Sequence, residues 1–384
     1  MNIDRMRNVD RYIGTPLCWI MGGLQPFFRR RVRAEIKNIL VIKFFGLGSI
    51  LLSTPALTLL RSAFPSAHIT YLSFTSNREL LQRIPLVDDI LTINTSGILS
   101  LTRDLPKVLS QLRSIRYDLV FDLEFFAKFS TLLSAWTGAP RRVGFELPTQ
   151  WRKMLVTHHV PLTKKKHVVH AFCDQVEAVA RSQTYSPNIC VPSVTESDVR
   201  SLHEKLPPEE TPFFCVNVNA ADTFLERRWQ PEKYSQFINN AARRSPYLFY
   251  FTGTQEERPY VQHIIDMLDA NTQSRCRNLA GTLTIPEFMQ LLRESVCLIS
   301  GDSGPVHLAA AFGTPVVALY GPETPDFYGP LGARTTVIYK AIECSPCMNI
   351  YDAKAFRCPY NARCIHEIQI EEVGHAVEQL GVLD

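Results

Sequence analysis

Apolar and polar positions change in regular blocks along most of the chain. Short runs of apolar residues end in small or polar residues, and each is followed by a longer stretch whose apolar residues recur at helical spacing. A short all-apolar run is typical of a strand covered on both faces, and the spacing after it is typical of an amphipathic helix. The alternation predicts an α/β fold built on doubly wound, mostly parallel sheets.

A first array of elements fills the N-terminal half. Its predicted strands are residues 39–42, 69–73, 87–93, 118–122 and 143–145. Its predicted helices are residues 50–64, 78–83, 105–115, 126–137 and 163–181.

A second array follows residues 187–212, which are rich in proline, serine and glutamate and hold a short helix near 196–206. Its predicted strands are 213–217, 248–251, a short one from 278, 297–299 and 315–320, and its helices 231–244, 259–268, 285–293, one after 303, and 369–380. We therefore expect three parts: a leader at 1–35, a first Rossmann-like domain at 36–190 and a second Rossmann-like domain at 210–384. Ligands are expected at the carboxyl ends of the strands, in a central cleft.

The leader combines an apolar, aromatic stretch at 12–28 with a cationic cluster, Arg29-Arg-Arg-Val-Arg33. This combination suits a segment that lies on an anionic membrane surface, or else a leader that packs across the domain groove. Four residues argue against one continuous helix: Pro16, Gly22, Gly23 and Pro26.

Composition narrows the class of protein. The chain has 384 residues, of which 46% are hydrophobic and 20% charged, values typical of packed globular domains. A net charge of +4 is too small to argue for a nucleic-acid partner. The sequence shows neither a secretory signal nor a run of about 18 apolar residues, so we expect a cytoplasmic protein with reduced thiols.

The stretch 297–321, Cys-Leu-Ile-Ser-Gly-Asp-Ser-Gly-Pro-Val-His and onward, predicts a strand, a tight turn, a short helix and a second strand. Ser303 can cap the helix, and Pro305 fits its first turn. A helix that opens after a parallel strand offers free N–H groups to a phosphate or diphosphate. An ordinary turn is the alternative, but the density of polar residues favours a ligand site at Asp302, Ser303, Gly304 and His307.

Other polar groups follow the earlier strands of the second array. Two guanidinium groups, Arg227 and Arg228, suit a diphosphate because each can form paired hydrogen bonds. Thr223 follows the first strand, and Glu256 follows the second, where a carboxylate can bind a ribose or a base. Each alone reads as a solvated loop residue, whereas their shared position after consecutive strands favours function.

These residues resemble glycosyltransferase family 9, the heptosyltransferases and their relatives. Three blocks carry the resemblance: 39–57 with 64–69, 227–231 with 253–257, and 301–311 with 315–321. The resemblance implies a GT-B fold of two Rossmann-like domains. It also implies inverting transfer of a sugar from a nucleotide-diphosphate donor, such as ADP-heptose, to a lipopolysaccharide-core or other lipid-linked saccharide.

The resemblance also assigns roles on the donor side. Asp302 would contact the sugar hydroxyls, and Glu256 would face the nucleoside. The diphosphate would lie among the other matching residues, namely Thr223, Arg227, Ser303, Gly304 and His307, with Arg228 beside them from its chemistry alone.

One position departs from the family. Its usual first turn reads Gly-Asp, with the aspartate as general base, whereas this chain has Gly48-Ser49. The hydroxyl of Ser49 needs a partner to act as a base. Either the base has moved, with Glu124 as first candidate and Asp122 as reserve, or the chain does not catalyse the standard reaction. The alternative role of Glu124 is to cap the following helix.

Four cysteines gather near the C-terminus, at Cys344, Cys347, Cys358 and Cys364. A Cys-x-x-Cys pair with two further cysteines can bind a structural zinc ion, although the later spacing is irregular, and free thiols or labile disulfides are the alternative. No catalytic metal is needed, since arginines and a helix N-terminus can neutralise the leaving diphosphate.

The sequence thus predicts a glycosyltransferase that lies peripherally on the inner face of a bacterial inner membrane and acts on a lipid-linked acceptor. The basic runs 29–33 and 164–166 suit an anionic lipid, or else are solvated faces. A non-catalytic sugar-nucleotide or glycan-binding protein and a sugar-nucleotide epimerase of the same architecture are the competing hypotheses.

Overall fold

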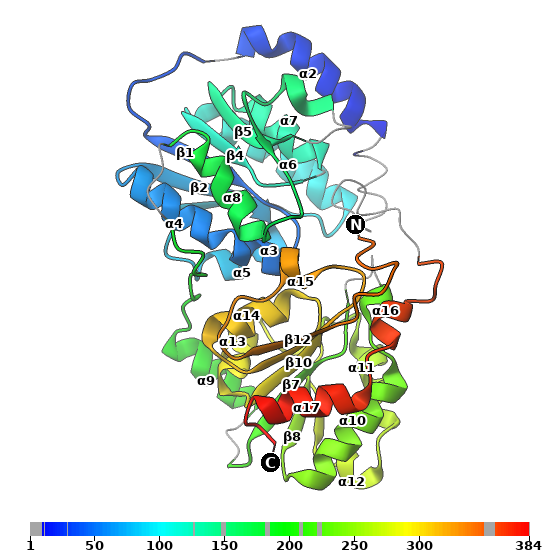
Figure 1. The fold of residues 1–384 in the computed structure, drawn as a ribbon. Coiled ribbons are helices and arrows are strands. Elements are labelled where there is room, and N and C mark those ends of the chain that lie inside the picture. Colours follow the sequence, from blue (N-terminus) through cyan, green and yellow to red (C-terminus); the bar gives the residue numbers. More distant parts are fainter. Residues whose placement is uncertain are drawn as a thin grey trace. The chain divides into compact units, whose positions relative to one another are not determined.

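The computed structural model describes residues 10, 12–28, 30–125, 127–146, 151–180, 185–206, 210–220, 225–348 and 358–383. The chain forms two compact units, and the boundary between them lies between Pro192 and Ser193. Each unit is built on one parallel sheet with helices on its faces (Figure 1). The predicted α/β, doubly wound architecture is therefore confirmed in both units.

The sheet of the first unit has the strand order β3-β2-β1-β4-β5-β6, with every neighbouring pair parallel. Its strands are β1 (Asn38–Ile42), β2 (His68–Phe74), β3 (Asp89–Ile93), β4 (Leu119–Asp122), β5 (Arg141–Glu146) and β6 (His158–Pro161). The helices of this unit are α2 (Gly14–Phe28), α3 (Leu47–Leu52), α4 (Thr54–Ala63), α5 (Arg78–Leu81), α6 (Ile98–Ser114), α7 (Lys128–Trp136) and α8 (Val168–Glu177), with 3-10 turns η1 (Thr75–Asn77) and η2 (Trp151–Met154).

The sheet of the second unit has the order β12-β11-β10-β7-β8-β9, again all parallel. Its strands are β7 (Phe213–Asn217), β8 (Leu248–Phe251), β9 (Cys276–Asn278), β10 (Cys297–Gly301), β11 (Val316–Tyr320) and β12 (Thr335–Tyr339). Its helical elements are α9 (Glu196–Lys205), η3 (Leu225–Arg227), α10 (Pro231–Arg244), α11 (Arg258–Asp266), α12 (Ala270–Gln273), α13 (Ile285–Glu294), α14 (Gly304–Phe312), α15 (Pro325–Tyr328), α16 (Arg363–His366) and α17 (Ile370–Gln379).

Both sheets follow the same winding. In each, the chain runs outward over three strands, returns to the centre and then runs outward the other way. The direction of winding therefore reverses between β1 and β4 in the first unit and between β7 and β10 in the second. Loops diverge at such a switch point, so the carboxyl ends of these four strands are where a ligand is expected in each unit.

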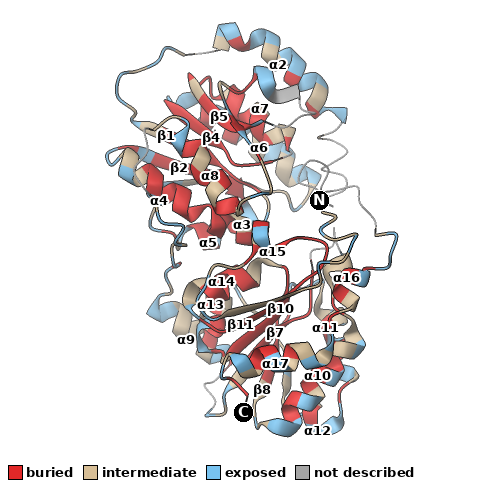
Figure 2. Cartoon of the chain, in the orientation of Figure 1, coloured by how far each residue is buried: buried red, intermediate tan, exposed pale blue. Residues whose placement is uncertain are grey.

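The central strands form the core of each unit. Four residues of β1, Ile39 to Ile42, are at most 1% exposed, and all five residues of β10 are buried (Figure 2). Burial on both faces explains why these strands are continuous apolar runs. The edge strand β12 is only half-buried along its length. It was not predicted, because its polar residues interrupt the apolar run that marks a buried strand.

The predicted helix at 50–64 is two helices. α3 ends at Leu52 and α4 begins at Thr54, with Ser53 between them. The hydroxyls of Ser53 and Thr54 donate to the carbonyls of Ile50 and Leu51, both at 2.7 Å. Pro55 has no N–H to continue the first helix but fits the first turn of a new one, so the break falls just before it.

The leader contains the continuous helix α2, contrary to the prediction from its prolines and glycines. Pro16 lies in the first turn, where a missing N–H costs nothing, and Pro26 lies in the last turn. Gly22 lies against Met154, since a Cβ there would come within 2.5 Å of the Met154 Cε atom. Cys18 and Met21 pack with Leu132, Ala135 and Leu155, and this packing outweighs the weak helix propensity.

Helix α9, the first element after the unit boundary, is fastened to α13 by the buried Glu287. The Glu287 carboxylate accepts hydrogen bonds from the Ser201 hydroxyl at 2.6 Å, the Lys205 ammonium at 2.8 Å and the Thr284 N–H at 2.7 Å. Burial alone would raise the pKa of Glu287, but these donors outweigh it and lower the pKa to about 2.

We predict that Glu287→Gln destabilises the protein by about 2 kcal/mol at neutral pH, because hydrogen bonds to a charged group contribute about 1.5–3 kcal/mol. A lowered folded-state pKa gives stability that is present above the unfolded value and lost as pH falls toward the folded value. The difference from wild type in urea unfolding should therefore shrink as pH falls from 4.5 toward about 2. A difference that stays constant with pH would contradict this origin, and Glu204→Gln, at an exposed position of α9, is the control.

Candidate functional site

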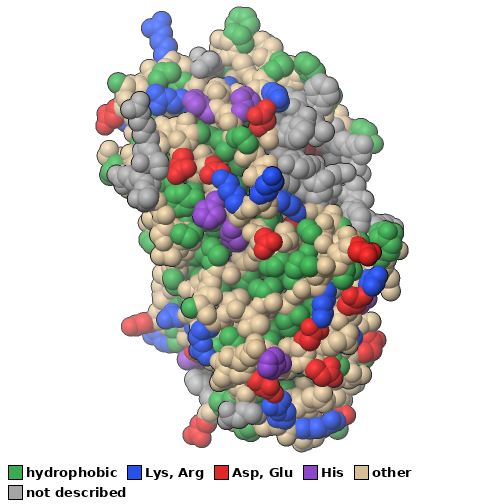
Figure 3. Space-filling view, in the orientation of Figure 1, with side chains coloured by type: hydrophobic (Ala, Val, Ile, Leu, Met, Phe, Trp, Pro, Cys, Tyr) green, Lys and Arg blue, Asp and Glu red, His purple; other side chains and the backbone are tan. Residues whose placement is uncertain are grey.

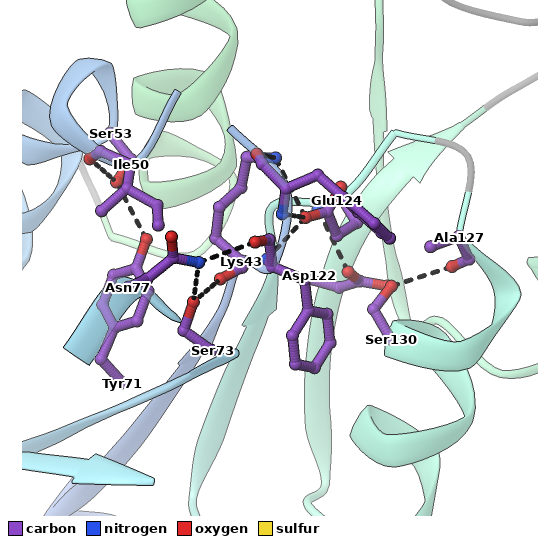
Figure 4. Close-up of polar contacts among 12 residues, drawn as sticks. Lys43, Ile50, Ser53, Tyr71, Ser73, Asn77, Asp122, Glu124, Ala127 and Ser130 are labelled. Carbon is purple, nitrogen blue, oxygen red and sulfur yellow. Dashed lines mark hydrogen bonds and ion pairs between the residues drawn. The ribbon is translucent and has the colours of Figure 1, made fainter. Parts of the chain in front are cut away.

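At the switch point of the first sheet, Lys43 follows β1 and Glu124 follows β4 (Figure 4). The Glu124 Oε1 atom accepts hydrogen bonds from the Lys43 ammonium at 3.0 Å, the Phe44 N–H at 2.6 Å and the Phe45 N–H at 2.9 Å. Both side chains are buried, with exposed fractions of 2% for Lys43 and 0% for Glu124. A buried pair of this kind is costly to break, because removing one partner leaves an uncompensated charge worth about 3–5 kcal/mol.

Polar side chains around the pair hold the loop that leaves β1. The Ser73 hydroxyl donates to the Lys43 carbonyl at 2.7 Å, and the Asn77 amide donates to the Phe44 carbonyl at 2.8 Å and to Ser73 Oγ at 2.9 Å (Figure 4). The Tyr71 hydroxyl lies 3.2 Å from Ser53 Oγ. Burial raises the pKa of Tyr71, and the charge of Glu124 raises it further. The loop between β1 and α3 is therefore fixed by hydrogen bonds from the side chains of Glu124, Ser73 and Asn77.

The three residues predicted at the catalytic position, the base candidates Glu124 and Asp122 and the substituted Ser49, take different places. Glu124 contacts the backbone of the loop that leads to Gly48 and Ser49. Asp122 is 1% exposed, accepts from the Thr131 hydroxyl at 2.6 Å and from the Glu124 N–H at 3.2 Å, and so supports Glu124 and α7. Ser49 lies half-buried in α3, beside Gly46, whose φ of +84° favours glycine at the start of the helix.

The alternative interpretation was that Glu124 caps α7, the helix that follows it. The structure gives this role to Asp10. The first N–H groups of α7, those of Lys128 and Phe129, donate to the Asp10 carboxylate at 3.1 and 2.8 Å. Asp10 comes from the leader, which the sequence pattern did not connect with this helix.

At the switch point of the second sheet, β10 ends in the turn that starts α14. Asp302 is 7% exposed, and the Arg227 guanidinium donates to its carbonyl at 3.0 Å and to its carboxylate at 3.3 Å. Ser303 is the N-cap residue, as predicted, but its hydroxyl forms no cap and instead lies 2.9 Å from Ser300 Oγ. Gly304 opens the helix, and His307 is buried in its first turn.

One further carboxylate, that of Glu323, belongs to this site and was not predicted. Glu323, which is 3% exposed, follows β11 and accepts from the Thr324 N–H at 2.9 Å. Burial raises the pKa of Tyr320 well above its usual value, and the charges of Asp302 and Glu323 raise it further, so these groups lie close together. The signal in the sequence was the position of Glu323 directly after a predicted strand.

The other donor-side candidates are less closely gathered. The Arg228 guanidinium lies 4.1 Å from the centre of the Tyr260 ring rather than on Asp302. Glu256 is exposed, whereas its neighbour Glu257 accepts from the Thr254 N–H at 2.7 Å. Thr223 lies outside the described residues.

The loops after β7 and β8 approach each other closely. The Asn219 amide donates to the Thr252 carbonyl at 2.9 Å, and a Cβ on Gly253 would lie 2.5 Å from the Asn219 Nδ2 atom. Only glycine fits at 253 without a shift of this loop.

Comparison with known proteins gives this arrangement a family. Residues 106–355 match glycosyltransferase family 9 (heptosyltransferase), which covers more than half of the chain. The chain belongs to glycosyltransferase family 9. It is 26% identical to lipopolysaccharide heptosyltransferase 2 of Escherichia coli K12 over 312 residues, which cover 78% of this chain and 87% of that protein.

Solved structures show the same fold. A family 9 glycosyltransferase from Veillonella parvula superposes with a TM-score of 0.72 at 22% identity, covering 90% of this chain and 97% of its own. The E. coli ADP-heptose lps heptosyltransferase II gives a TM-score of 0.70 at 22% identity, covering 89% and 98%. The fold is GT-B, as the resemblance implied, and the protein is a glycosyltransferase; neither the binding-protein nor the epimerase hypothesis is favoured by these similarities.

The four C-terminal cysteines lie within electrostatic reach of one another, near the end of β11, but they do not form one cluster. The Cys347 N–H donates to the Pro322 carbonyl at 3.0 Å, and a Cβ on Gly321 would lie 3.2 Å from Cys364 Sγ. Burial raises the pKa of Cys347 to about 11, and the charges of Cys358 and Cys344 add to the rise. All four are free thiols, and among the described residues no group of three or more Cys, His, Asp or Glu side chains is arranged to hold a metal ion.

Zinc at these cysteines stays a prediction from their spacing, and it requires the thiols to move together. We predict about one zinc ion per chain in protein purified with zinc, because the dication would cancel the repulsion among four thiolates. Cys347→Ser should release the metal, whereas Cys190→Ser, in the other unit, should retain it. Metal-free protein with four reactive thiols in this segment would contradict the prediction; elemental analysis and thiol titration decide between the two.

Proposed function

We propose that this chain transfers a heptose from ADP-heptose to the saccharide core of lipopolysaccharide, with inversion at the anomeric carbon. The observation that carries the proposal is the pairing of Arg227 with Asp302 at the start of α14, in a chain of the heptosyltransferase family. The names of the two E. coli proteins, lipopolysaccharide heptosyltransferase 2 and ADP-heptose lps heptosyltransferase II, include this acceptor and this donor, which supports the choice.

The donor side supplies what the departing diphosphate requires. The N-terminus of α14 offers backbone N–H groups and the positive end of a helix dipole, and Arg227 adds a fixed positive charge. In the proposed reaction an acceptor oxygen bonds to the anomeric carbon, the bond from that carbon to the diphosphate oxygen breaks, and ADP departs. Arg227 and α14 stabilise the charge that develops on ADP, and Asp302 orients the sugar hydroxyls.

The acceptor of this reaction is a lipid-linked saccharide. An enzyme that meets such an acceptor while using a soluble nucleotide sugar works best at the cytoplasmic face of the inner membrane. We therefore propose a cytoplasmic protein that associates peripherally with that face. Among the described residues, no helix has the length and apolar character needed to cross a bilayer.

We predict that purified protein converts ADP-heptose and a heptose-deficient core acceptor into ADP and an extended core, measured by mass spectrometry. Arg227→Gln should weaken ADP binding in calorimetry about 10- to 100-fold, since a charge-assisted hydrogen bond contributes about 1.5–3 kcal/mol. The matched control is Arg243→Gln, which removes an exposed arginine paired with Asp269 and should leave ADP affinity unchanged. Tighter binding of another nucleoside diphosphate, or equal affinity in both variants, would contradict the proposed donor site.

For the general base we propose Glu124. Its carboxylate accepts hydrogen bonds from the N–H groups of Phe44 and Phe45, in the loop that leads into α3. Helix α3 carries Ser49 at the position where the family has its aspartate, so the carboxylate lies beside the loop that precedes this position. Burial of a base before the acceptor binds does not exclude the role, because catalytic contacts often form only with substrate in place.

We predict that Glu124→Gln lowers transfer by at least about 100-fold while ADP still binds, since general base catalysis contributes about 10²- to 10⁴-fold. This variant also leaves Lys43 charged and buried without its partner, so stability must be measured beside activity.

The double variant Lys43→Met/Glu124→Gln separates the two effects. With both charges removed it should regain thermal stability but stay inactive. If activity returns together with stability, Glu124 only holds the loop and is not the base.

A further inference from the structure

Helix α2 turns one row of large apolar side chains toward solvent. Ile13, just before the helix, and four residues of the helix follow at intervals of four and three, which places them on one strip of helix surface. Their exposed fractions are 53% for Ile13, 44% for Leu17, 59% for Ile20, 42% for Leu24 and 84% for Phe27. We call this row the apolar strip.

The rest of the outward face of α2 is also free of charge. Residues Gly14 to Phe28 include no acidic or basic side chain, and their one long polar side chain, that of Gln25, is buried. Tyr12 and Trp19 flank the apolar strip with exposed fractions of 71% and 50%. Hydrophobic side chains reach the surface along this helix in the space-filling view (Figure 3). Exposed apolar surface of this extent is rare outside interaction sites.

The helix is fixed at both ends, so the apolar strip is presented on a rigid support. Asp10 caps α7 just before the helix begins. Just after it, the Arg30 N–H donates to the Gly138 carbonyl at 2.9 Å, and its guanidinium donates to the Ile115 carbonyl at 3.0 Å. The inner face packs against α7 through Cys18.

Positive charge gathers at the C-terminal end of α2. Burial lowers the pKa of Arg30, and the guanidinium groups of Arg113, Arg116 and Arg33 lower it further, so the four lie within electrostatic reach of one another. Among the described residues, Asp118 is the one carboxylate within ion-pair distance of these four groups, 3.8 Å from Arg33. We call these four residues the arginine cluster, and Arg31 beside it is exposed.

We propose that α2 docks the first unit on an anionic lipid surface, with the apolar strip among the acyl chains and the arginine cluster on the headgroups. The helix is about 22 Å long, enough to lie in the interface but not to cross it. An apolar face beside four arginines that have one carboxylate within ion-pair distance among the described residues matches a negatively charged leaflet. This inference deepens the proposed function, because it names what would hold the enzyme where its lipid-linked acceptor lies.

A second copy of the chain fits the surface less well. Apolar residues spaced four and three apart would also suit packing against a partner helix. However, α2 carries no acidic residue that could form an ion pair with the arginine cluster of another copy. Only an anionic surface satisfies the apolar strip and the arginine cluster together.

The test is cosedimentation of the full chain with vesicles, without donor or acceptor. Vesicles containing phosphatidylglycerol should bind the protein much more tightly than vesicles of phosphatidylcholine alone. The triple variant Ile20→Ser/Leu24→Ser/Phe27→Ser should bind them about 100-fold more weakly, because it removes three of the five large apolar side chains that would enter the acyl chains. The matched control Val191→Ser/Tyr360→Ser, exposed at 54% and 59% outside α2, should bind like wild type.

The charge contribution is tested separately. Arg31→Gln/Arg116→Gln should weaken binding to phosphatidylglycerol vesicles about tenfold or more, since each basic residue contributes about 1 kcal/mol, and should not affect binding to phosphatidylcholine. ADP affinity should be unchanged in every variant, which shows that the second unit is intact. The proposal is overturned if wild type does not bind, if the triple variant binds equally well, or if ultracentrifugation shows a dimer that the triple variant abolishes. Because no sugar is transferred in this assay, its failure leaves the proposed reaction untouched, and the reverse also holds.

Discussion

The winding of each sheet reverses once, and this constraint places the polar side chains on which the chemistry depends. Between β1 and β4 the reversal brings Lys43 and Glu124 together, and between β7 and β10 it brings Arg227, which follows β7, into contact with Asp302. Parallel strands deliver their carboxyl ends to one edge of the sheet, and helices leave that edge in opposite directions at the switch point. The same winding in both units thus yields two polar edges with different contents: a buried ion pair in one, and an arginine, two carboxylates and a helix start in the other.

The Lys43–Glu124 pair shows how a fixed geometry can cost stability. Taking both charges out of water is unfavourable, and their attraction offsets it only with further hydrogen bonds. Those bonds come from the N–H groups of Phe44 and Phe45, so the pair also fixes the backbone between β1 and α3. A hydrophobic pair of similar volume would pack as well but would not hold this loop. The retention of charge here is therefore best understood through the loop it shapes.

The fold could be predicted from the sequence far better than the site. Continuous apolar runs such as 39–42 and 297–299 mark strands buried on both faces, and these central strands were placed within a residue or two. Edge strands β6 and β12 were not predicted, because half-buried strands lack a continuous apolar run. Helix α2 was missed because helix propensity is a local property, whereas its packing on α7 is tertiary.

Site residues divide in the same way. Asp302 and Arg227 could be found because each follows a predicted element in a dense polar motif, and the structure joins them. The pairing of Glu124 with Lys43, 81 positions apart in sequence, could not be read from local spacing. Nor could the role of Asp10, whose partner amides lie 118 and 119 positions away.

The contact between Asp10 and α7 also bears on where the first unit begins. The region that matches the family starts at residue 106, and the first strand starts at Asn38, so a shorter chain beginning just before that strand would seem complete. Such a chain would lose the carboxylate at the start of α7 and would bare Ala135 and Leu155, which Cys18 now covers. Asp10 and α2 are thus part of the folding unit of the first sheet. Removing them would expose apolar core residues to solvent.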